Sequence, residues 1–391
     1  MQYRSGRQGE SISILGYGCM RFTRTKGAID LDKAQREVTA AIASGVNYLD
    51  TAYVYPGNEA AVGQILQRSG LREKVFLATK LPQYLVRSRA AMDRYLAEQL
   101  RRLQTDHIDF YLLHMLSGKN SWERLVALGI QDWIREKKAE GSIRRIGFSF
   151  HGNTANFLEL LECYDWDFCQ IQYNYMDETT QAGRRGLEAA QAKGIPVIIM
   201  EPLRGGRLTV GLPPQAQELL ETEGQGRSAA EWGLRWLWNQ PGVTCVLSGM
   251  NSLEMVQENC RIADLARPGE MTEADFALIA RLKEAIAQSQ RVGCTGCGYC
   301  QPCPHGVDIP GVFRCWNEIG VDGAKRARRE YLQTTAMRSP STGARQCVGC
   351  GKCEQHCPQA IPIRQALQDA RHDLETPLYH LTAAAYRLFK I

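Results

Sequence analysis

Short apolar segments alternate with longer amphipathic segments along the first 250 residues of this chain. The short segments have the composition and length of buried β-strands. Turn-forming residues or helix-like stretches separate them. We predict eight strands, at residues 13–18, 47–52, 75–80, 108–114, 144–150, 169–174, 196–200 and 245–250.

The stretches between these strands have helical patterning, as at residues 32–45, 90–104 and 180–194. The first and third of them end in glycine, which commonly closes a helix. Eight strands that are each followed by a helix specify a parallel barrel rather than an open sheet. We therefore predict an α/β fold, a (β/α)8 TIM barrel.

The remaining sequence predicts a second, smaller domain. The 391 residues exceed the roughly 250 of a typical barrel. The last barrel helix is expected to run into a short link at Val292 and Gly293, and residues 309–333 and 359–391 have helical patterning. We place the boundary at residue 290, with a barrel over 1–290 and a small α-rich domain over 291–391.

Composition and the amino-terminal sequence predict where the protein is located and argue against a membrane role. Hydrophobic residues make up 44% of the chain, which is ordinary for a protein with a real core. The amino terminus lacks the pattern of a secretion signal, and no apolar run approaches the roughly 18 residues of a membrane span. We expect a cytoplasmic protein without a membrane partner.

Charge divides unevenly between the two predicted domains. Residues 291–391 hold 13 Lys and Arg against 8 Asp and Glu, whereas residues 1–290 hold 34 of each. The surplus is concentrated in "AKRARRE", residues 324–330. It is either a docking patch for an acidic partner or nucleic acid, or a solvated helix face beside anionic cofactors. We favour the second interpretation and expect no nucleic-acid partner.

Eight of the fourteen cysteines fall in two tight runs after residue 290. A structural zinc site draws four ligands from two separated pairs. Here each run has three cysteines spaced by two residues, followed by a fourth before proline, which is the bacterial ferredoxin pattern. We therefore predict two [4Fe-4S] clusters, with zinc or bare thiols as the alternatives.

In two-cluster ferredoxins the fourth cysteine of each run ligates the other cluster. The first run departs from the pattern, because only two residues precede its last cysteine, and 43 residues separate the runs. His305 and His356 are expected to face solvent or to lie behind the ligands, and the six remaining cysteines to be buried apolar residues. The predicted ligand sets are Cys294, Cys297, Cys300 and Cys357 for one cluster, and Cys347, Cys350, Cys353 and Cys303 for the other.

Four residues at the carboxyl ends of predicted strands form a device for moving a proton to or from a carbonyl oxygen. The pKa of a tyrosine hydroxyl lies near 10, and a nearby ammonium lowers it by favouring phenolate. Lys80 can supply that charge to Tyr55, Asp50 can hold Lys80, and His114 can orient the substrate oxygen. Each of the four residues alone has an ordinary structural explanation, but together they predict an active site.

These residues lie in "GVNYLDTAYVYPGNEAAVG", "LATK" and "IDFYLLH", and there the chain resembles the aldo-keto reductase family over roughly residues 1–285. The resemblance implies that Asp50, Tyr55, Lys80 and His114 are a catalytic tetrad. It also implies a nicotinamide cofactor, NADP(H) or NAD(H), that is bound without a Rossmann fingerprint. The cysteine-rich tail is similar to a bacterial subgroup in which a ferredoxin-like segment follows the barrel.

The resemblance also implies cofactor contacts. Ser149 and Gln170 match the positions that bind the nicotinamide amide. Residues 248–259 align with the adenosine-phosphate loop and keep Glu258 and Asn259, but Met250 and Met255 stand where a basic residue normally meets the 2′-phosphate. Arg204 and Arg207, in the glycine-rich "LRGGRL", are either compensating phosphate contacts or surface charges.

Three functions follow from these observations. The first is an oxidoreductase that reduces a small-molecule carbonyl or oxidises an alcohol, with Tyr55 as the acid–base group. Hydride transfer moves two electrons, whereas clusters exchange one at a time. The second is therefore a cluster-driven reductase, which is fed by a ferredoxin or flavodoxin without nicotinamide. The third is a non-catalytic subunit in which the clusters sense redox state or oxygen.

Overall fold

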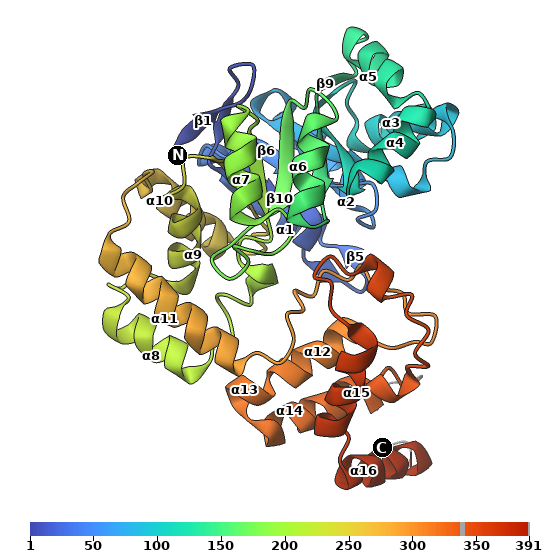
Figure 1. Ribbon diagram of the computed structural model, residues 1–391, viewed down its shortest axis with the longest axis vertical. Coiled ribbons are helices and arrows are strands. Elements are labelled where there is room, and N and C mark those ends of the chain that lie inside the picture. The colour runs from blue at the N-terminus through green and yellow to red at the C-terminus, as the bar shows by residue number, and fades with distance from the viewer. Residues whose placement is uncertain (337–340, 390–391) are drawn as a thin grey trace. The chain divides into compact units, whose positions relative to one another are not determined.

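The computed structural model describes residues 1–336 and 341–389. Its contacts divide the chain into two compact units, which we call the barrel unit and the cysteine unit (Figure 1). The barrel unit comprises Met1–Pro202 and Ala230–Met271. The cysteine unit comprises Leu203–Ala229 and Thr272–Ile391, so it takes a segment from the middle of the chain as well as its end.

Eight strands of the barrel unit close into a barrel in chain order, and every neighbouring pair is parallel. All eight predicted strands are present, so the predicted TIM-barrel fold is confirmed. The strands are β3 (Leu15–Gly18), β6 (Tyr48–Asp50), β7 (Phe76–Leu81), β8 (Ile108–Leu116), β9 (Ile143–Phe150), β10 (Phe168–Gln172), β11 (Val197–Met200) and β12 (Val243–Ser248).

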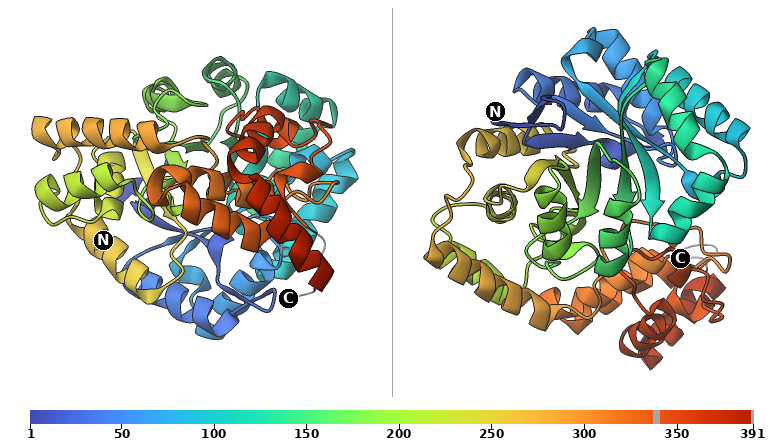
Figure 2. Two further views of the ribbon diagram at one scale, coloured as in Figure 1. Left: turned by 90° about the horizontal axis from the view of Figure 1, so that it is seen from below. Right: turned by 45° about the horizontal axis from the view of Figure 1, so that its top comes forward.

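Helices surround these strands (Figure 2, right). The first of them begins where the Asp30 side chain accepts a hydrogen bond from the Lys33 backbone, and it buries Ala34, Val38 and Ala41 at helical spacing. The helices of the barrel unit are α1 (Leu31–Ala43), α2 (Asn58–Ser69), α3 (Arg89–Leu103), α4 (Lys119–Ala127), α5 (Ile130–Ala139), α6 (Thr154–Glu162), α7 (Gly183–Ala192), α9 (Ala229–Trp238) and α10 (Leu253–Leu265).

Side chains fill the barrel interior, so it is a core and not a pore. The ring of Phe110 packs edge-on against Tyr48, Phe76 and Phe168, with ring centroids 5.0 to 5.6 Å apart. Cys245 belongs to the same buried cluster. Cys19, Cys169, Cys245, Cys260 and Cys315 are buried as predicted, whereas Cys163 is partly exposed.

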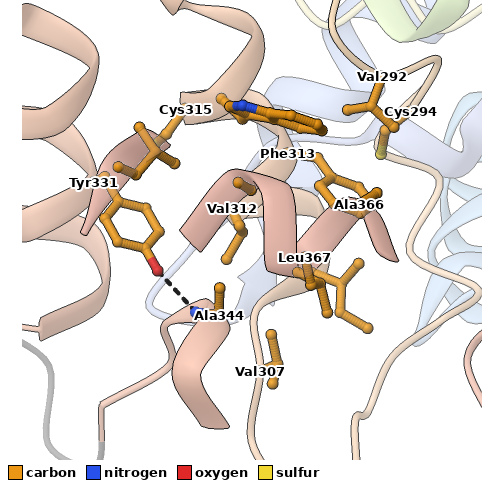
Figure 3. Close-up of a cluster of buried hydrophobic side chains, with 14 of the residues drawn as sticks. Val292, Cys294, Val307, Val312, Phe313, Cys315, Tyr331, Ala344, Ala366 and Leu367 are labelled. Carbon is orange, nitrogen blue, oxygen red and sulfur yellow. Dashed lines mark hydrogen bonds between the residues drawn. The ribbon is translucent and has the colours of Figure 1, made fainter. Parts of the chain in front are cut away.

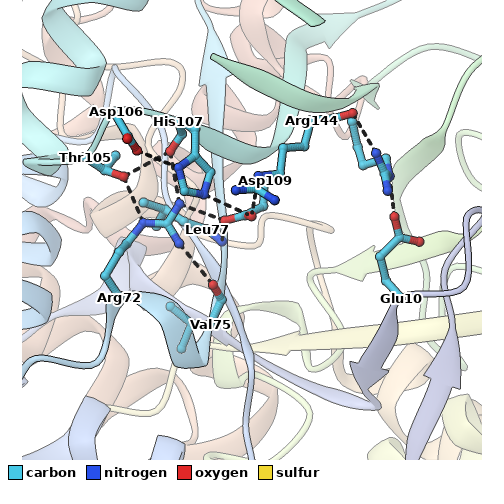
Figure 4. Close-up of polar contacts among 10 residues, drawn as sticks. Glu10, Arg72, Val75, Leu77, Thr105, Asp106, His107, Asp109 and Arg144 are labelled. Carbon is cyan, nitrogen blue, oxygen red and sulfur yellow. Dashed lines mark hydrogen bonds and ion pairs between the residues drawn. The ribbon is translucent and has the colours of Figure 1, made fainter. Parts of the chain in front are cut away.

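Polar contacts organise the amino-terminal ends of the strands. An antiparallel hairpin, β1 (Tyr3–Ser5) with β2 (Ser11–Ser13), lies there: Arg4 donates to the Val243 carbonyl, and Arg145 pairs with Glu10. Asp109 accepts from Arg72 Nη2 at 2.8 Å and from the Leu77 backbone at 2.9 Å (Figure 4). A second small hairpin joins β4 (Arg24–Thr25) and β5 (Ala28–Ile29).

The cysteine unit is helical, as predicted, although Lys390 and Ile391 of the predicted last helix lie outside the described residues. Val312, Phe313 and Leu367 are among its buried side chains (Figure 3). The Tyr331 hydroxyl accepts from the Ala344 backbone and donates to Glu375, both at 2.8 Å. Its helices are α8 (Pro214–Glu223), α11 (Glu273–Ser289), α12 (Ile309–Asn317), α13 (Ile319–Asp322), α14 (Ala324–Tyr331), α15 (Ile363–Leu374) and α16 (Pro377–Phe389).

Two helices before the cysteine runs group with them and not with the barrel. By its contacts α11, expected to be the last barrel helix, belongs to the cysteine unit together with α8, against which it packs. None of the described helices combines the length and the apolar character that a membrane span requires.

Candidate active site and thiol clusters

Three of the predicted catalytic residues lie on adjacent barrel strands, β6, β7 and β8. Lys80 Nζ donates to the two carboxylate oxygens of Asp50 at 2.7 and 2.6 Å and to the Thr51 carbonyl at 2.7 Å. The Lys80 and Asp50 side chains are only 1% and 6% exposed. All three ammonium hydrogens are therefore used, which holds the lysine in one position.

Tyr55 lies in the loop between β6 and α2, beside this pair. Its ring centroid is 5.6 Å from Lys80 Nζ and 6.3 Å from the His114 ring centroid, with the two ring planes at 88°. The Tyr84 ring centroid is also 6.3 Å from the imidazole centroid, with the two ring planes at 47°. The structure thus brings all four predicted residues together and adds a second tyrosine that sequence reasoning did not single out.

Burial sets the charge states at this site. It lowers the pKa of His114 well below its usual value, and the neighbouring Lys80 and His151 lower it further. Burial also raises the pKa of the Asp50 carboxyl, while the Lys80 ammonium opposes that change. At neutral pH the imidazole of His114 is uncharged, which leaves Lys80 as the fixed positive charge next to Tyr55.

The strand that carries His114 is irregular directly after it. Met115 has a left-handed φ of 58°, and the pairing of β8 with β9 shifts register between Leu113 and Leu116. The Met115 backbone N–H donates to Ser149 Oγ at 2.9 Å. Ser149 therefore fixes the bulge beside His114 and keeps its own hydroxyl hydrogen for another acceptor.

The two residues expected to bind the nicotinamide amide face each other across neighbouring strands, with Gln170 opposite Ser149. The Gln170 amide nitrogen contacts Met200 Sδ at 3.6 Å. Its Oε1 is buried and has no hydrogen-bond partner among the described residues. A buried amide oxygen is costly unless a donor reaches it, and a carboxamide NH2 is such a donor. The site thus fits the amide end of a nicotinamide.

Residues 248–259 form the end of β12, a loop and the first turns of α10. Ser252 caps the helix by accepting from the Met255 backbone, and Asn259 Nδ2 donates to Ser248 Oγ at 3.0 Å. Asn259 thus holds α10 to the strand end, and Glu258 lies beside it on the helix. A capped helix amino terminus at this place is suited to a phosphate.

Sequence reasoning did not single out two further residues, Arg21 and His151, which lie near the strand ends. Arg21 lies against Gly249 in the loop before α10, since a Cβ at Gly249 would be 3.0 Å from Arg21 Cδ. Its Nη2 is buried and has no hydrogen-bond partner in the described part of the chain. His151 follows β9 and lies close enough to His114 to lower its pKa. Their position directly after predicted strands was the available signal.

Arg204 and Arg207 belong to the cysteine unit. The Arg204 guanidinium donates to Gln290 Oε1 at 3.1 Å. Burial lowers the pKa of Arg207, and of the charged groups around it Cys294 has the largest opposing effect. Both arginines thus lie near the start of the first cysteine run.

The eight cysteines of the two runs can all serve as thiolate ligands. None of the fourteen cysteines, all of which are described, forms a disulfide. Burial raises the pKa of Cys300, and the charges of Cys297, Cys294 and Cys357 raise it further, so these four thiols lie within electrostatic reach. In the second run burial raises the pKa of Cys353, and the Cys347 charge adds to that effect.

A tetrahedral zinc–thiolate site brings its sulfurs within about 3.8 Å of each other. Among the described residues, the one group of three potential metal ligands whose ligand atoms lie within 4.8 Å of one another is Cys315, Glu318 and Glu330, outside the two runs. Arg314 is bonded to both of those carboxylates, which makes the group an ion-pair network. His305 and His356 are exposed, in agreement with the sequence-based expectation.

Comparison with known proteins gives two family matches. The model of the aldo/keto reductase family matches residues 14–283, and that of the 4Fe-4S dicluster domain matches residues 293–361. Among curated relatives, methylglyoxal reductase YeaE of Escherichia coli is 31% identical over 264 residues, which are 63% of this chain and 85% of that protein. The uncharacterized oxidoreductase YqkF of Bacillus subtilis is 28% identical over 319 residues, covering 73% and 98%.

Solved structures of the same kind are similar as well. Aldo-keto reductase AKR11C1 from Bacillus halodurans, in its holo form, has a TM-score of 0.60 and 28% identity, covering 72% of this chain and 96% of that one. An aldo/keto reductase from Klebsiella pneumoniae in complex with NADP and acetate has a TM-score of 0.58 and 27% identity, covering 72% and 95%.

Proposed function

Since the chain belongs to the aldo/keto reductase family and is an oxidoreductase with a 4Fe-4S dicluster domain, we propose that it reduces a small-molecule carbonyl with Tyr55 as the proton donor. The observation that carries this proposal is the buried Asp50–Lys80 pair beside the Tyr55 ring. A structural ion pair has no need of a tyrosine and a neutral histidine next to its ammonium.

Each of the four residues has a distinct role in this proposal. NADP(H), when bound, supplies the hydride. The Tyr55 hydroxyl donates its proton to the carbonyl oxygen, and the Lys80 charge stabilises the phenolate that remains. Asp50 fixes Lys80, and the uncharged His114 can donate a hydrogen bond to the oxygen as negative charge develops there. Alcohol oxidation uses the same groups in reverse.

Replacing Tyr55 by phenylalanine tests the acid–base role. Methylglyoxal, the substrate in the name of the E. coli relative, is a suitable first carbonyl compound. We expect Tyr55→Phe to lower kcat/KM by about 10²- to 10⁴-fold, the usual contribution of a general acid. Tyr53→Phe is the matched control, because the Tyr53 ring packs against Tyr95 and Arg102. If Tyr55→Phe retains as much activity as an active Tyr53→Phe variant, Tyr55 is not the proton donor.

For the nicotinamide cofactor we propose contacts from Ser149 and Gln170 at the amide and from Glu258 and Asn259 toward the adenosine phosphate. The proposal does not extend to Arg204 and Arg207, because both belong to the cysteine unit. The unsatisfied Gln170 Oε1 supports the amide end, and the solved relative from Klebsiella pneumoniae in complex with NADP supports this class of cofactor. We also propose a division of the sequence at residue 290, which is supported by the two family matches, since one ends at residue 283 and the other begins at residue 293. This division follows the family matches and not the contacts, which group α8 and α11 with the cysteine unit. Parallel titrations with NADPH and NADH distinguish the two cofactors.

For the thiol clusters we propose two [4Fe-4S] groups, one held by Cys294, Cys297, Cys300 and Cys357 and the other by Cys347, Cys350, Cys353 and Cys303. The electrostatic reach between Cys300 and Cys357 supports the exchange of ligands between the two runs. Such groups supply one-electron transfer.

A second candidate function is reduction of the barrel's substrate by a ferredoxin or flavodoxin without nicotinamide. Surface features favour it: the second run exposes Cys350 and 64% of Val348, with Arg345 and Lys352 also exposed. An apolar spot with cations nearby suits brief docking of an acidic carrier.

Anaerobic reduction distinguishes these two functions. The iron-loaded protein is mixed with NADPH, NADH or reduced ferredoxin, and the EPR signal of the reduced clusters is followed. If reduced ferredoxin produces this EPR signal and the carbonyl compound is reduced in the absence of nucleotide, the second function is favoured. Carbonyl reduction that requires NADPH and proceeds with oxidised clusters would favour the first.

A further inference from the structure

The loop that carries Tyr55 is attached to β7 at both of its ends. At its start the Asp50 carboxylate accepts from Lys80 Nζ. At its end Glu59, in the first turn of α2, accepts from the Thr79 hydroxyl at 2.7 Å. Thr79 and Lys80 are neighbours on β7. The loop therefore returns to the strand directly beside the lysine at which it starts.

Glu59 is almost fully buried, with 2% of its side chain exposed. Its Oε1 accepts from Thr79 and, at 2.8 Å, from Gln99 Nε2, and its Oε2 accepts from Arg102 Nη1 at 3.2 Å. Gln99 Nε2 also lies 3.1 Å from the Lys80 carbonyl oxygen. Hydrogen bonds to a carboxylate are stronger than those between neutral groups, so three donors hold this one firmly in place. Glu59 thus reaches β7 directly at Thr79 and through Gln99 at Lys80.

The first turn of α2 is also tied to Tyr55. The N-cap of the helix is Gly57, which has a left-handed φ of 76°, and no side chain among the described residues caps the helix there. The Asn58 backbone N–H donates to the Tyr55 carbonyl at 3.1 Å. A displacement of this turn would therefore displace Tyr55, and the buried Glu59 is the side chain that fixes the turn to β7.

We propose that Glu59 is a positioning residue for the acid–base step, because it fixes the loop that keeps the Tyr55 ring beside the Lys80 ammonium. The inference rests on the proposed role of Tyr55 as the proton donor. The Tyr55 ring centroid lies 5.6 Å from Lys80 Nζ. The attraction between an ammonium and a phenolate weakens with distance, so this spacing sets how strongly Lys80 favours the phenolate. Glu59 itself gains and loses no proton in the step.

The competing role for Glu59 is stability alone, as a partner of Arg102 between α2 and α3. Arg102 has a second carboxylate, however, because its Nε donates to Glu98 at 2.8 Å. The other two donors to Glu59 lead to β7 at Thr79 and Lys80. This convergence on the strand position of the lysine favours the positioning role.

The variant Glu59→Gln tests the inference in the full-length protein. It keeps the size of the side chain but replaces one accepting oxygen by a donor, and Arg102 still has Glu98. We expect kcat/KM for methylglyoxal to fall by about 10- to 10²-fold, the cost of a small misplacement at a reacting group. The Kd for NADPH should be unchanged, since the proposed cofactor contacts lie on other strands.

A spectroscopic readout follows Tyr55 without relying on activity. The ultraviolet phenolate absorption of a protein, minus that of the same protein carrying Tyr55→Phe, gives the titration of Tyr55 alone. Its midpoint should rise by about one pH unit in Glu59→Gln, because an ammonium that is held less closely favours the phenolate less. A carboxylate that serves stability alone would leave this midpoint where it is.

The double variant Glu59→Gln/Tyr55→Phe shows whether Glu59 acts through Tyr55. Effects of residues that act as a unit are not additive. Once the tyrosine hydroxyl is gone, Glu59→Gln should therefore cause little further loss of kcat/KM.

Glu98→Gln is the matched control. It removes a carboxylate that pairs with the same Arg102, but from a side chain that is 31% exposed, and it should leave kcat/KM and the Tyr55 titration unchanged. If Glu59→Gln does not fold, Thr79→Val and Thr79→Ser replace it. Valine lacks the hydroxyl that donates to Glu59 and should raise the midpoint of Tyr55, whereas serine keeps the hydroxyl and should retain the wild-type midpoint.

Two results would overturn the inference. The first is a folded Glu59→Gln protein, or in its place Thr79→Val, in which Tyr55 titrates as in wild type. The second is a loss of kcat/KM that is equally large in the Tyr55→Phe background, which would mean that Glu59 acts elsewhere. Full activity of Tyr55→Phe would instead refute the proposed proton donor, and the Tyr55 titration would still decide whether Glu59 holds the ring beside Lys80.

Discussion

Two carboxylate–cation pairs stand at opposite ends of the barrel, and their surroundings differ. At the amino-terminal end Asp109 accepts from Arg72 and from the Leu77 backbone, and His107 lies 3.5 Å away. These partners tie the segment before β7 to the start of β8. The pair is partly accessible, with 16% of the Arg72 side chain exposed. Its contacts are those of a structural network.

At the carboxyl end Asp50 and Lys80 are more deeply buried, and the groups around them can exchange protons. Tyr55 lies over the ammonium, and His114 and His151 lie nearby. A buried pair adds little stability in itself, because desolvation offsets the attraction between the charges. The comparison shows that the neighbours of an ion pair, more than its own geometry, indicate whether it serves the fold or the chemistry.

The largest expected effect is at the carboxyl end. Lys80→Met should lower kcat/KM by about 10²- to 10⁴-fold, because the charge that stabilises the Tyr55 phenolate is lost. It should also lower the free energy of unfolding by about 3–5 kcal/mol, since Asp50 is left buried without its cation. Steady-state kinetics and chemical denaturation measure the two effects.

The double variant Asp50→Asn/Lys80→Met separates stability from chemistry. It removes both charges, so most of the unfolding free energy should return while kcat/KM stays low. Recovery of activity along with stability would mean that the pair at the carboxyl end is as structural as the one at Asp109.

A smaller effect is expected at the amino-terminal end. Asp109→Asn keeps an acceptor for the Leu77 backbone but loses the charge that Arg72 requires. We expect the free energy of unfolding to fall by about 1–3 kcal/mol, with kcat/KM within about twofold of wild type. Arg72→Met should behave in the same way. A loss of activity in either variant, at temperatures where the protein is fully folded, would contradict the division between the two ends.

The sequence predicts the barrel and its four catalytic candidates because both leave local patterns. A strand buried on two faces is a short apolar segment, and residues just after such segments must gather at one end of the barrel. Asp50, Tyr55, Lys80 and His114 could be predicted for this reason. The spacing of Cys294 to Cys303 and of Cys347 to Cys357 is equally local.

Long-range packing leaves no such pattern. The amphipathic stretch that becomes α11 reads like any barrel helix, and only its contacts with α8 place it in the cysteine unit. Arg207 has the same sequence signal whether it belongs to the barrel unit or to the cysteine unit, and only the contacts place it in the cysteine unit. Arg21 and His151 were not singled out because a single charged or titratable residue after a strand is usually solvated, and only the structure shows what lies beside it.

The smallest expected effect is a loss of stability at acid pH, and it should arise at the carboxyl end of the barrel. Burial lowers the pKa of His151 to about 4. Below the unfolded value of about 6.5 the unfolded chain binds a proton that the folded protein does not, so stability falls as pH falls. Between pH 7 and pH 5 the free energy of unfolding should fall by about 2 kcal/mol. The loss is about 1.36 kcal/mol per pH unit over the roughly 1.5 units below 6.5, the pKa of histidine in the unfolded chain.

Replacing His151 by glutamine should therefore remove about 2 kcal/mol of the acid sensitivity, as measured by denaturant unfolding at pH 7 and pH 5. The pKa of His114, at the same end of the barrel, is also lowered by burial, so the free energy of unfolding of the variant should still decrease as pH falls. His372→Gln, at a side chain that is 90% exposed, is the control for the substitution itself. If His151→Gln keeps the full wild-type dependence on pH, the imidazole is not held uncharged, and the carboxyl end loses one of the features that set it apart from the Asp109 network.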